Sequence, residues 1–233
     1  MKKKILVFLN NILNTNINYL DVNNYDVIYI FSHNLINADI KLLILLINYA
    51  DIIILTGGPQ HLIENKINKY PEINIIIKII DLCYIFNKLL IGICLGCQLI
   101  ALTYGMKIIK LNKLHVGKYF LDLTTLNMNI INNDNFLKKI NFKLLKNSFS
   151  FHNDGIYDIH NSHIDILAYS KTRVPYIIRH KKKPIYGFQF HPEATINSII
   201  NSLNKYDIKI DINKNDDIIY NKINKMFFNI FLN

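Results

Sequence analysis

The sequence predicts an α/β fold, in which a mostly parallel central sheet is flanked by helices and extended by antiparallel strands in the C-terminal half. Short apolar runs rich in Ile and Val alternate with segments of helical length over the first hundred residues, a pattern typical of a parallel sheet covered on both faces. After Gly105 the strand-like runs follow one another closely, which indicates antiparallel pairing. The C-terminal end has apolar residues at helical spacing, which indicates a final packing helix.

The individual elements are expected in the following order. Four short apolar runs are candidates for buried strands: residues 4–9, 26–31, 51–55 and 89–93. Helices are expected over residues 36–49, 71–86 and 95–104, and Pro71 suits the first turn of the second helix. The closely spaced strands of the C-terminal half are residues 118–124, 166–170, 176–179 and 185–190. The last helix is expected over residues 216–232, and residues 197–214 look like extra sequence before it.

The composition favours one folded domain in a reducing compartment. Of the 233 residues, 51% are hydrophobic, which gives enough apolar surface to offset the entropy cost of ordering the backbone. No tract of Pro, Gly or Ser marks a linker, so we expect a single domain over residues 1–233, with residues 197–233 as an extended C-terminal segment that ends in a helix. Three cysteines without the spacing of a disulfide framework indicate the cytoplasm.

Membrane and nucleic-acid partners are not favoured. The lysine-rich start resembles a signal peptide, but Asn10 and Asn11 interrupt its apolar run, so it is better interpreted as a first strand. No run reaches the roughly 18 apolar residues that a membrane span requires. The net charge of +10 is scattered, with tight clusters only at residues 2–4 and 181–183. An acidic docking face on a partner protein explains this charge better than nucleic acid does.

The segment around Cys94 predicts a reactive thiol. Cys94 follows an apolar run and precedes a helical one, with Gly92 and Gly96 two residues before and after it. A sharp turn between strand and helix crowds these two positions, so both must be small, as in the thiol version of the nucleophile elbow. Cys94 would then lie at a helix N-terminus, where the helix dipole favours the thiolate form.

Two other interpretations of the cysteines stay open. Cys94 could be a buried small hydrophobe, which is the usual role of a free cysteine. Cys94 and Cys97 also have the Cys-x-x-Cys spacing of dithiol oxidoreductases, and under oxidation they could form a link that switches an enzyme off. The simpler interpretation, that Cys97 only packs on the helix, is preferred, because redox chemistry leaves two further segments unexplained.

The first of these segments supplies a base for the thiol. His191 lies at the end of the last expected strand and Glu193 follows two residues later. A thiol nucleophile needs a base within hydrogen-bond reach, and that base needs a third group to fix its tautomer. Pro192 would hold the backbone extended, so that both side chains could point into one pocket. The sequence therefore predicts a triad of Cys94, His191 and Glu193.

The second segment supplies backbone donors. Residues 56–59, Thr-Gly-Gly-Pro, follow the strand expected over 51–55, where the carboxyl ends of a parallel sheet form a binding crevice. The backbone N–H groups of Gly58 and Leu95 would make an oxyanion hole, worth about 3 kcal/mol per donor. Taken alone, a Gly-Gly-Pro turn is usually only a turn.

In content, order and spacing these three segments resemble the class I, or triad, glutamine amidotransferases. The resemblance covers roughly residues 4 to 195 and implies a flavodoxin-like fold, a γ-glutamyl thioester on Cys94, and ammonia passed to a partner synthetase. It also implies that glutamine is held by Gln98 and by the turn at Gly57 and Gly58. No cofactor is expected in this chain, because ATP and Mg²⁺ would belong to the synthetase.

Residues 150–154 resemble the Ser-His-x-Asp segment of this family, which lines the glutamine pocket. Phe151 replaces the usual serine, so a hydroxyl contact would be lost while backbone contacts from Phe151 and Asn153 would survive. His152 and Asp154 are therefore further candidates for substrate binding. In the alternative interpretation, His152 and Asp154 are a hydrogen-bonded pair in a loop.

The acceptor of the ammonia is less well defined. Residues 167–170 and 185–193 are similar to the amidotransferase subunit of GMP synthase, which would place the chain in purine biosynthesis, converting XMP to GMP with its partner. Two features depart from that pattern: residues 194–197 lack a histidine common after the glutamate, and His115 stands where an acidic residue is common.

Other members of this superfamily supply alternative functions. The subunit of another synthetase (anthranilate, aminodeoxychorismate or carbamoyl phosphate) and a stand-alone γ-glutamyl peptidase are the enzymatic alternatives. A regulatory relative with a degenerate site is the non-enzymatic one, and the intact triad argues against it.

Overall fold

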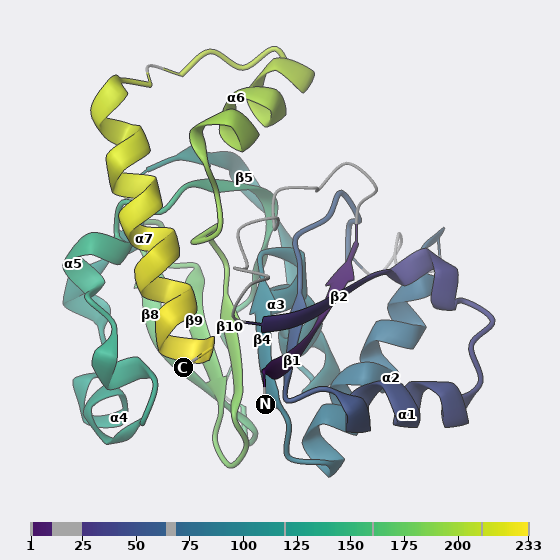
Figure 1. Cartoon of the computed structure of the whole chain (residues 1–233). Coiled ribbons are helices and arrows are strands. Elements are labelled where there is room, and N and C mark those ends of the chain that lie inside the picture. Colours follow the sequence, from purple (N-terminus) through teal and green to yellow (C-terminus); the bar gives the residue numbers. More distant parts are fainter. Residues whose placement is uncertain are drawn as a thin grey trace.

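The computed structural model in Figure 1 describes residues 2–10, 25–63, 69–118, 120–159, 161–210 and 212–232. Its centre is a sheet of eight strands in the order β2-β1-β3-β4-β10-β9-β8-β6. The strands are β1 (Lys3–Leu9), β2 (Tyr25–Phe31), β3 (Ile52–Leu55), β4 (Leu89–Ile93), β6 (Leu121–Asp122), β8 (Ile164–Ser170), β9 (Pro175–His180) and β10 (Ile185–Phe188).

The first five strands of this order run parallel and the last three antiparallel. β1 pairs in parallel with β2 and β3, β3 with β4, and β4 with β10. This is the doubly wound order of the flavodoxin-like fold. β9 then pairs antiparallel with β10, and β8 and β6 extend the sheet in the same way. The predicted fold class, a parallel sheet with an antiparallel extension, is confirmed.

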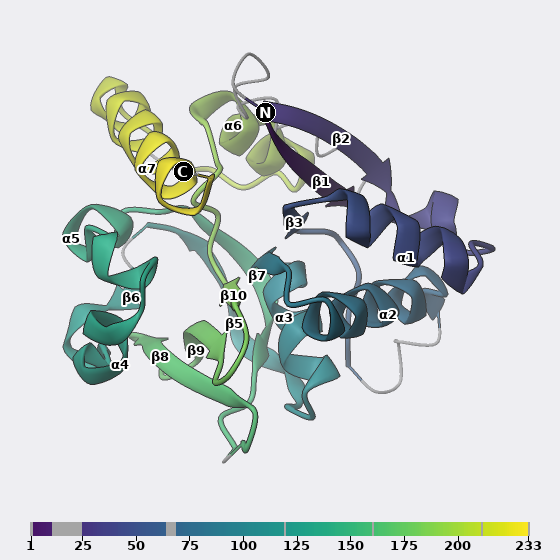
Figure 2. The same ribbon diagram turned by 60° about the horizontal axis from the view of Figure 1, so that its bottom comes forward.

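Helices cover both faces of the sheet, as Figures 1 and 2 show. One apolar core joins the sheet to α1 (Ile40–Tyr49), α2 (Glu72–Ile85) and α3 (Leu95–Thr103). A second core on the opposite face contains α4 (Met128–Asn133), α5 (Phe142–Leu145) and the last helix, α7 (Lys214–Leu232). The residues of β1, β3 and β4 alternate between the two cores, as the two-sided burial of a parallel strand requires.

The helix expected over residues 36–49 begins later, at Ile40. Asp39 caps it, because its carboxylate accepts a hydrogen bond of 2.7 Å from the backbone N–H of Leu42. A short 3-10 helix, Ser32–Leu35, precedes the cap. A side-chain acceptor at the cap position satisfies one of the free N–H groups of the first turn, which fixes the start of the helix.

The strand expected over residues 118–124 is mostly wrong. Of the described residues in this range, Leu121–Asp122 alone pair in the sheet, and a 3-10 helix follows over Leu123–Thr125. The carboxylate of Asp122 accepts hydrogen bonds from the backbone N–H and the hydroxyl of Thr124, at 3.0 and 2.7 Å. Such local bonds give the backbone an alternative to the sheet, so the chain turns.

A two-stranded antiparallel ribbon, β5 (Ile108–Gly117) and β7 (Ser150–Ile156), was not predicted. The register between its strands shifts between Lys110 and His115. The ribbon lies near the top of Figure 1 beside α6 (Ile196–Lys205), at the carboxyl ends of the parallel strands. Residues 197–214, expected only as extra sequence, therefore include most of a helix.

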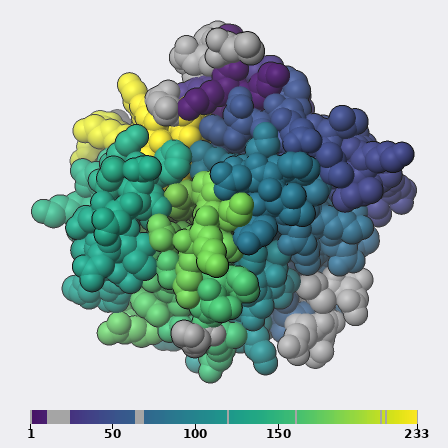
Figure 3. All heavy atoms as spheres, turned by 90° about the horizontal axis from the view of Figure 1, so that it is seen from below, coloured from purple at the N-terminus to yellow at the C-terminus, as the bar shows by residue number. Residues whose placement is uncertain are grey.

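The opposite end of the molecule is seen from below in Figure 3. There the green residues of β8 to β10 lie between the teal segment of α4 and α5 and the blue residues around α2. Among the described residues no helix has both the length and the apolar content needed to cross a bilayer.

Candidate active site

Cys94 lies on a tight bend between β4 and α3. Its backbone torsions, φ 53° and ψ −104°, are strained for a residue with a side chain, and such strain is typical of functional turns. A Cβ atom on Gly92 would lie 2.5 Å from the carbonyl oxygen of Gly96, and a Cβ on Gly96 would come still closer to the carbonyl oxygen of Leu55. Only glycine fits at either position. This confirms the steric reason given by the sequence for small residues two positions before and two positions after Cys94.

His191 and Glu193 lie beside this bend. The two side chains meet through a contact of 2.7 Å between Nδ1 of His191 and Oε1 of Glu193. His191 and Cys94 line the same cavity, and a Cβ atom on Gly57 would contact both side chains, at 2.9 Å from Cε1 of His191 and 3.4 Å from Cβ of Cys94. The structure therefore brings the three residues of the predicted triad together.

The pKa of His191 reflects these neighbours. Burial alone lowers it, but the negative charges of the Glu193 carboxylate and of the Cys94 sulfur as a thiolate outweigh burial and hold the pKa well above its ordinary value. A nearby negative charge favours the imidazolium form. His191 is thus suited to accept a proton from the thiol and to keep it while a substrate binds.

The backbone from His191 to Glu193 differs from the extended segment that was expected. β10 ends at Phe188, and His191 forms a single bridge with Phe149 beyond the sheet. The N–H of Ala194 then donates to the carbonyl of His191 at 3.3 Å and closes a turn around Pro192 and Glu193. This turn, rather than a continued strand, directs Glu193 back onto the imidazole.

The C-terminal helix supports the turn from behind. The side-chain amide of Asn224 in α7 donates a 2.9 Å hydrogen bond to the backbone carbonyl of Glu193. Because Asn224 and the carboxylate-bearing Glu193 are both buried, this bond ties the last helix to the site.

The Gly-Gly-Pro turn lies directly above the thiol and the imidazole. A Cβ on Gly57 would lie 2.9 Å from Cε1 of His191 and 3.4 Å from Cβ of Cys94. A Cβ on Gly58 would lie 2.8 Å from Cδ2 of Leu95. Gly58 and Leu95 are therefore neighbours on the cavity wall, whereas Gly57 packs behind His191 and is not among the described residues that line the cavity.

The amide side chains of Gln189 and Gln98 lie on the same side of the bend as the thiol and are hydrogen-bonded to each other. Nε2 of Gln189 is 3.9 Å from the sulfur of Cys94, and the carbonyl oxygen of Phe151 is 4.0 Å from it. Gln98 donates through Nε2 to the backbone carbonyl of Asp154 at 2.9 Å and to Oε1 of Gln189 at 3.2 Å. Sequence reasoning missed Gln189, although its position two residues before His191 could have indicated it.

Cys97 is completely enclosed beneath the bend. A Cβ on Gly187 of β10 would lie only 2.7 Å from its sulfur. Burial, with a smaller contribution from Cys94, raises the pKa of the Cys97 thiol well above its ordinary value. A protonated, buried thiol is a poor partner for thiol exchange, which favours the packing interpretation over the redox one.

The segment of residues 150–154 is part of strand β7 and not a loop. Nδ1 of His152 contacts the backbone carbonyl of Asp154 at 2.9 Å, and Nε2 contacts the hydroxyl of Tyr176 at 3.2 Å. Burial lowers the pKa of His152 to about 3, so the ring is neutral. The carboxylate of Asp154 does not bond to His152; its Oδ2 contacts Nδ1 of His61 at 2.7 Å.

His115, which departs from the pattern of GMP synthase, is buried in the ribbon near His152. Its ring stacks on Phe120 with centroids 4.5 Å apart, and its Nε2 contacts the hydroxyl of Thr172 at 2.8 Å. Burial lowers the pKa of His115. The residue is a neutral packing element behind the cavity and does not line it.

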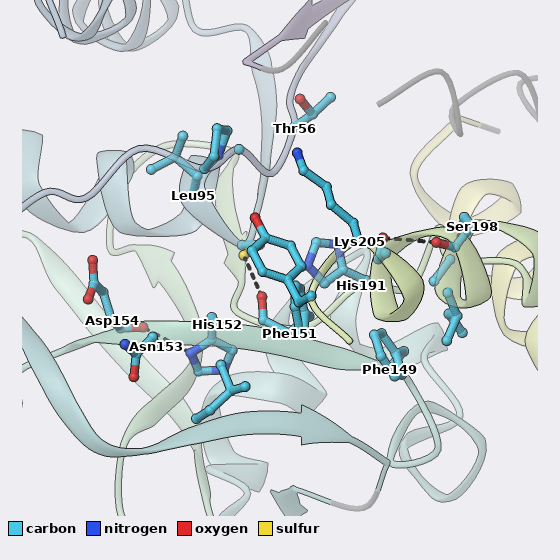
Figure 4. A pocket seen from close by; sticks show the side chains of 18 of the residues that line it. Thr56, Leu95, Phe149, Phe151, His152, Asn153, Asp154, His191, Ser198 and Lys205 are labelled. Carbon is cyan, nitrogen blue, oxygen red and sulfur yellow. Dashed lines mark hydrogen bonds between the residues drawn. The ribbon is translucent and has the colours of Figure 1, made fainter. Parts of the chain in front are cut away.

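The candidate residues surround one open cavity of about 660 Å³, shown in Figure 4. Of the residues that were predicted, those on its wall are Gly58, Cys94, Leu95, Gln98, Phe151, His152, Asn153, Asp154, His191 and Glu193. Sequence reasoning missed other wall residues, including Gln60, His61, Lys205 and Tyr206. Because these come from a loop and from the end of α6, no local motif marks them.

Comparison with known proteins agrees with this geometry. A model of the class I glutamine amidotransferase family matches residues 18–199. A glutamine amidotransferase-like protein of Acanthamoeba polyphaga mimivirus is 33% identical over 208 residues, which are 86% of this chain and 85% of that protein. One subunit of the glutamine-hydrolysing GMP synthase of Picrophilus torridus is 34% identical over 145 residues, which are 62% of this chain and 68% of that subunit.

A solved structure shares the fold. The crystal structure of a glutamine amidotransferase from Thermotoga maritima has a TM-score of 0.66 at 16% identity, and the superposition covers 99% of this chain and 94% of the other. The extent of the family match, together with the identity to these relatives, establishes the family. This chain belongs to the class I glutamine amidotransferases.

Proposed function

We propose that this chain hydrolyses the side-chain amide of L-glutamine with Cys94 as nucleophile, His191 as base and Glu193 as the group that orients the base. The observation that supports the proposal most strongly is the 2.7 Å contact between His191 and Glu193 beside a cysteine on a strained bend. A nucleophile, a base and an orienting carboxylate within one cavity are the parts that acyl transfer requires.

In this proposal the reaction proceeds in two steps, acylation of Cys94 and hydrolysis of the resulting thioester. The sulfur of Cys94 attacks the amide carbon of glutamine, its proton passes to His191, and His191 gives that proton to the leaving nitrogen, so that ammonia departs and a γ-glutamyl thioester remains. Water then attacks the thioester with His191 as base. The proton returns to the sulfur, and glutamate is released.

Backbone donors stabilise the intermediate in this proposal. The N–H of Leu95 belongs to the first residue of α3, where no carbonyl within the helix can accept it. The N–H of Gly58 would be the second donor, because Gly58 packs against Leu95 on the cavity wall. Each such donor is worth about 3 kcal/mol in the transition state.

The substrate would lie along the same wall, held by the turn at Gly57 and Gly58 and by Gln98. The amide of Gln98 already donates to Asp154 and Gln189, so Gln98 would act on the substrate indirectly, by holding strand β7 beside the bend that carries Cys94. Backbone groups of Phe151 and Asn153, with the side chains of His152 and Asp154, would complete the pocket. Oδ1 of Asp154 is buried without a partner among the described residues, which leaves it free to accept a hydrogen bond from a substrate.

The ammonia would pass to a partner synthetase. The similarity to a GMP synthase subunit supports GMP synthase as that partner, with XMP as the acceptor and purine biosynthesis in the cytoplasm as the setting. In this proposal ATP and Mg²⁺ bind the synthetase, and this chain needs no cofactor of its own.

The proposed chemistry is tested on the isolated chain. Cys94 should be labelled by 6-diazo-5-oxo-L-norleucine, a diazoketone analogue of glutamine, and the label should be absent in Cys94→Ser. Glutamine hydrolysis should be slow and should accelerate when a synthetase and its acceptor substrate are added. Faster cleavage of a γ-glutamyl dipeptide than of glutamine, with no response to any synthetase, would instead identify a stand-alone peptidase.

The acceptor is tested separately. The native chain is used to capture its partner, the co-purifying synthetase is identified, and XMP amination is measured with glutamine as the nitrogen source. GMP formation that depends on Cys94 supports the assignment. Capture of a synthetase that aminates another acceptor refutes GMP synthase as the partner, but leaves the glutaminase proposal intact.

A further inference from the structure

The turn that carries Glu193 receives little support from the sheet. Strand β10 ends at Phe188, and beyond it His191 makes a single bridge with Phe149. The bond that closes the turn, from the N–H of Ala194 to the carbonyl of His191, is 3.3 Å long, which is beyond the usual range of a backbone hydrogen bond. The direction of the Glu193 side chain therefore depends on what else holds the turn.

The carboxylate of Glu193 is held at one of its two oxygens. Oε1 contacts Nδ1 of His191 at 2.7 Å, whereas Oε2 is buried and has no hydrogen-bond partner among the described residues. A single contact sets the distance between carboxylate and imidazole, but it does not fix the plane of the carboxylate. The orientation of Glu193 must then come from the backbone that carries it.

Asn224 holds this backbone from the last helix. Its side-chain Nδ2 donates a 2.9 Å hydrogen bond to the carbonyl oxygen of Glu193, and both residues are buried. A buried carbonyl that loses its donor is costly, so this bond resists breaking. Asn224 lies in α7, after the end of the family match at residue 199. The contact is therefore supplied by a part of the chain that the family model does not include.

The same helix packs on the strand that supports the nucleophile. The rings of Phe227 and Phe231 lie against the ring of Phe188 in β10, with centroids 4.8 and 5.7 Å apart. The carbonyl of Phe188 accepts the N–H of Cys94 at 2.8 Å. Phe227 is three positions after Asn224, so the two side chains lie on one face of α7, and Figure 1 shows this helix running along the sheet at β9 and β10. One helix face thus supports both the bend of the thiol and the turn of the acid.

The first turn of α7 is anchored to the ribbon. Oδ1 of Asp216 contacts Nζ of Lys118, just after β5, at 2.6 Å. Oδ2 of Asp216 accepts the backbone N–H of Asn213 at 3.1 Å. Because α7 is fixed at its start and along its length, the amide of Asn224 is a stationary point to which the turn is tied.

We propose that Asn224 is a positioning residue for the reaction: by holding the carbonyl of Glu193 it fixes the direction from which the carboxylate meets His191. This inference rests on the proposed glutaminase activity. Among the described residues that line the cavity Asn224 is not included, so it acts through Glu193 and not on the substrate.

Kinetics on Asn224→Leu test this role, because leucine has about the same size and no donor. The variant should lose about tenfold in kcat for glutamine with KM unchanged, since a misdirected carboxylate displaces the base by a fraction of an ångström. In a Glu193→Ala background the same substitution should cost almost nothing, because the group that Asn224 positions is already absent.

The pH dependence of Cys94 alkylation by iodoacetamide gives a measurement that needs no glutamine. The charges that act on His191 are those of Glu193 and of Cys94 itself, and His152 beside them is neutral. A misdirected carboxylate favours the imidazolium less, so less thiolate exists at a given pH. The alkylation profile of Asn224→Leu should therefore move to higher pH by about 0.5 to 1 unit.

Two controls separate positioning from stability. Asn221→Leu removes an exposed asparagine from the same helix and should match the wild type in kcat and in the alkylation profile. Ile230→Ala opens a cavity at a buried position of α7; it should lower the unfolding temperature but keep both values where it is folded. Asn224→Ser is the second variant if Asn224→Leu does not fold, and it should show a smaller change in the same direction.

The outcomes separate this inference from the proposal on which it rests. Unchanged kcat and an unchanged alkylation profile in the folded Asn224 variants refute it. An equal loss in the Glu193→Ala background, or the same loss in Ile230→Ala, refutes it as well, because the effect then does not pass through the acid. If the wild type does not hydrolyse glutamine, the glutaminase proposal has failed, while the alkylation profile still decides whether Asn224 positions Glu193.

Discussion

Gly57→Ala tests whether the Gly-Gly-Pro turn sets the position of the base. The new Cβ would lie 2.9 Å from Cε1 of His191, and the obstacle is an imidazole ring held by Glu193 rather than the end of a flexible side chain. Ordinary contacts of a Cβ begin at 3.4 Å. The ring must therefore withdraw by about 0.5 Å (3.4 − 2.9) or the turn must rise by the same amount.

This displacement should change the stability of the fold little but should lower the reaction rate clearly. Misplacing a reacting group by about 1 Å can cost about a hundredfold in rate, so a shift of half that size should lower kcat/KM for glutamine by about tenfold. Tenfold corresponds to about 1.4 kcal/mol of transition-state stabilisation. Overpacking of this kind costs about 1–3 kcal/mol of folding free energy, so the variant should still fold.

The assay compares three measurements on Gly57→Ala and on a control. Glutaminase rate, alkylation of Cys94 by iodoacetamide, and thermal unfolding are recorded for both proteins. Gly155→Ala is the control, because its Cβ would meet side-chain atoms of Val174 and Leu111 at 2.8 and 2.9 Å, away from His191. Wild-type activity in Gly57→Ala, or equal losses in the two variants, would refute the idea that the turn positions the imidazole.

Three further predictions address the orienting acid, the buried histidine and the last helix. Glu193→Gln should fold normally and lose about 10²–10⁴-fold in kcat, because the carboxylate that holds the imidazolium is gone; near-normal steady-state kinetics would contradict this. The folded-state pKa of His152 is lowered to about 3 from 6.5, so the unfolded chain binds the proton first and stability is lost as pH falls below 6.5. The loss should reach about 3 kcal/mol at pH 4, and urea titrations should show that His152→Gln lacks it. Phe231→Ala should lower the free energy of unfolding by about 3–5 kcal/mol, because this buried ring packs on Phe136 and Phe188; an unchanged denaturation midpoint would show that α7 does not depend on it.

The parallel half of the fold and the elbow could be predicted because their signals are local. Runs of Ile and Val with helical segments between them encode β1, β3 and β4, and the pair of glycines around Cys94 encodes a bend that excludes side chains. The carboxyl ends of neighbouring parallel strands meet at one edge. The sequence predicted that Cys94 and His191 meet, but it grouped residues 185–190 with the antiparallel strands, whereas β10 pairs in parallel with β4 and antiparallel only with β9.

The rest of the site depends on contacts that no local pattern encodes. Half of the residues of β5 are exposed, and the strand carries Lys, Asn and His in place of an apolar alternation, so neither strand nor helix periodicity could reveal it. His61 meets Asp154 across 93 positions of the chain, and Lys205 follows the family motifs in a segment that resembles no motif. The extended backbone expected at Pro192 was wrong for a related reason, because a hydrogen bond from Ala194 to His191 closes a turn there.

The way the triad is supported explains why the wall at α6 can differ without disturbing the chemistry. β4 and β10 are paired with Gly92 opposite Gly187 and Ile93 opposite Phe188, and the N–H of Cys94 donates to the carbonyl of Phe188 at 2.8 Å. A shift of one residue in this register would turn every side chain of β10 to the other face, so nucleophile and base are fixed to each other by buried backbone bonds. Lys205, at the end of α6, is exposed, and its ammonium group lies over the ring of Tyr206, 5.7 Å from the ring centroid. Substitution on the wall at α6 should therefore leave the alkylation of Cys94 by iodoacetamide unchanged.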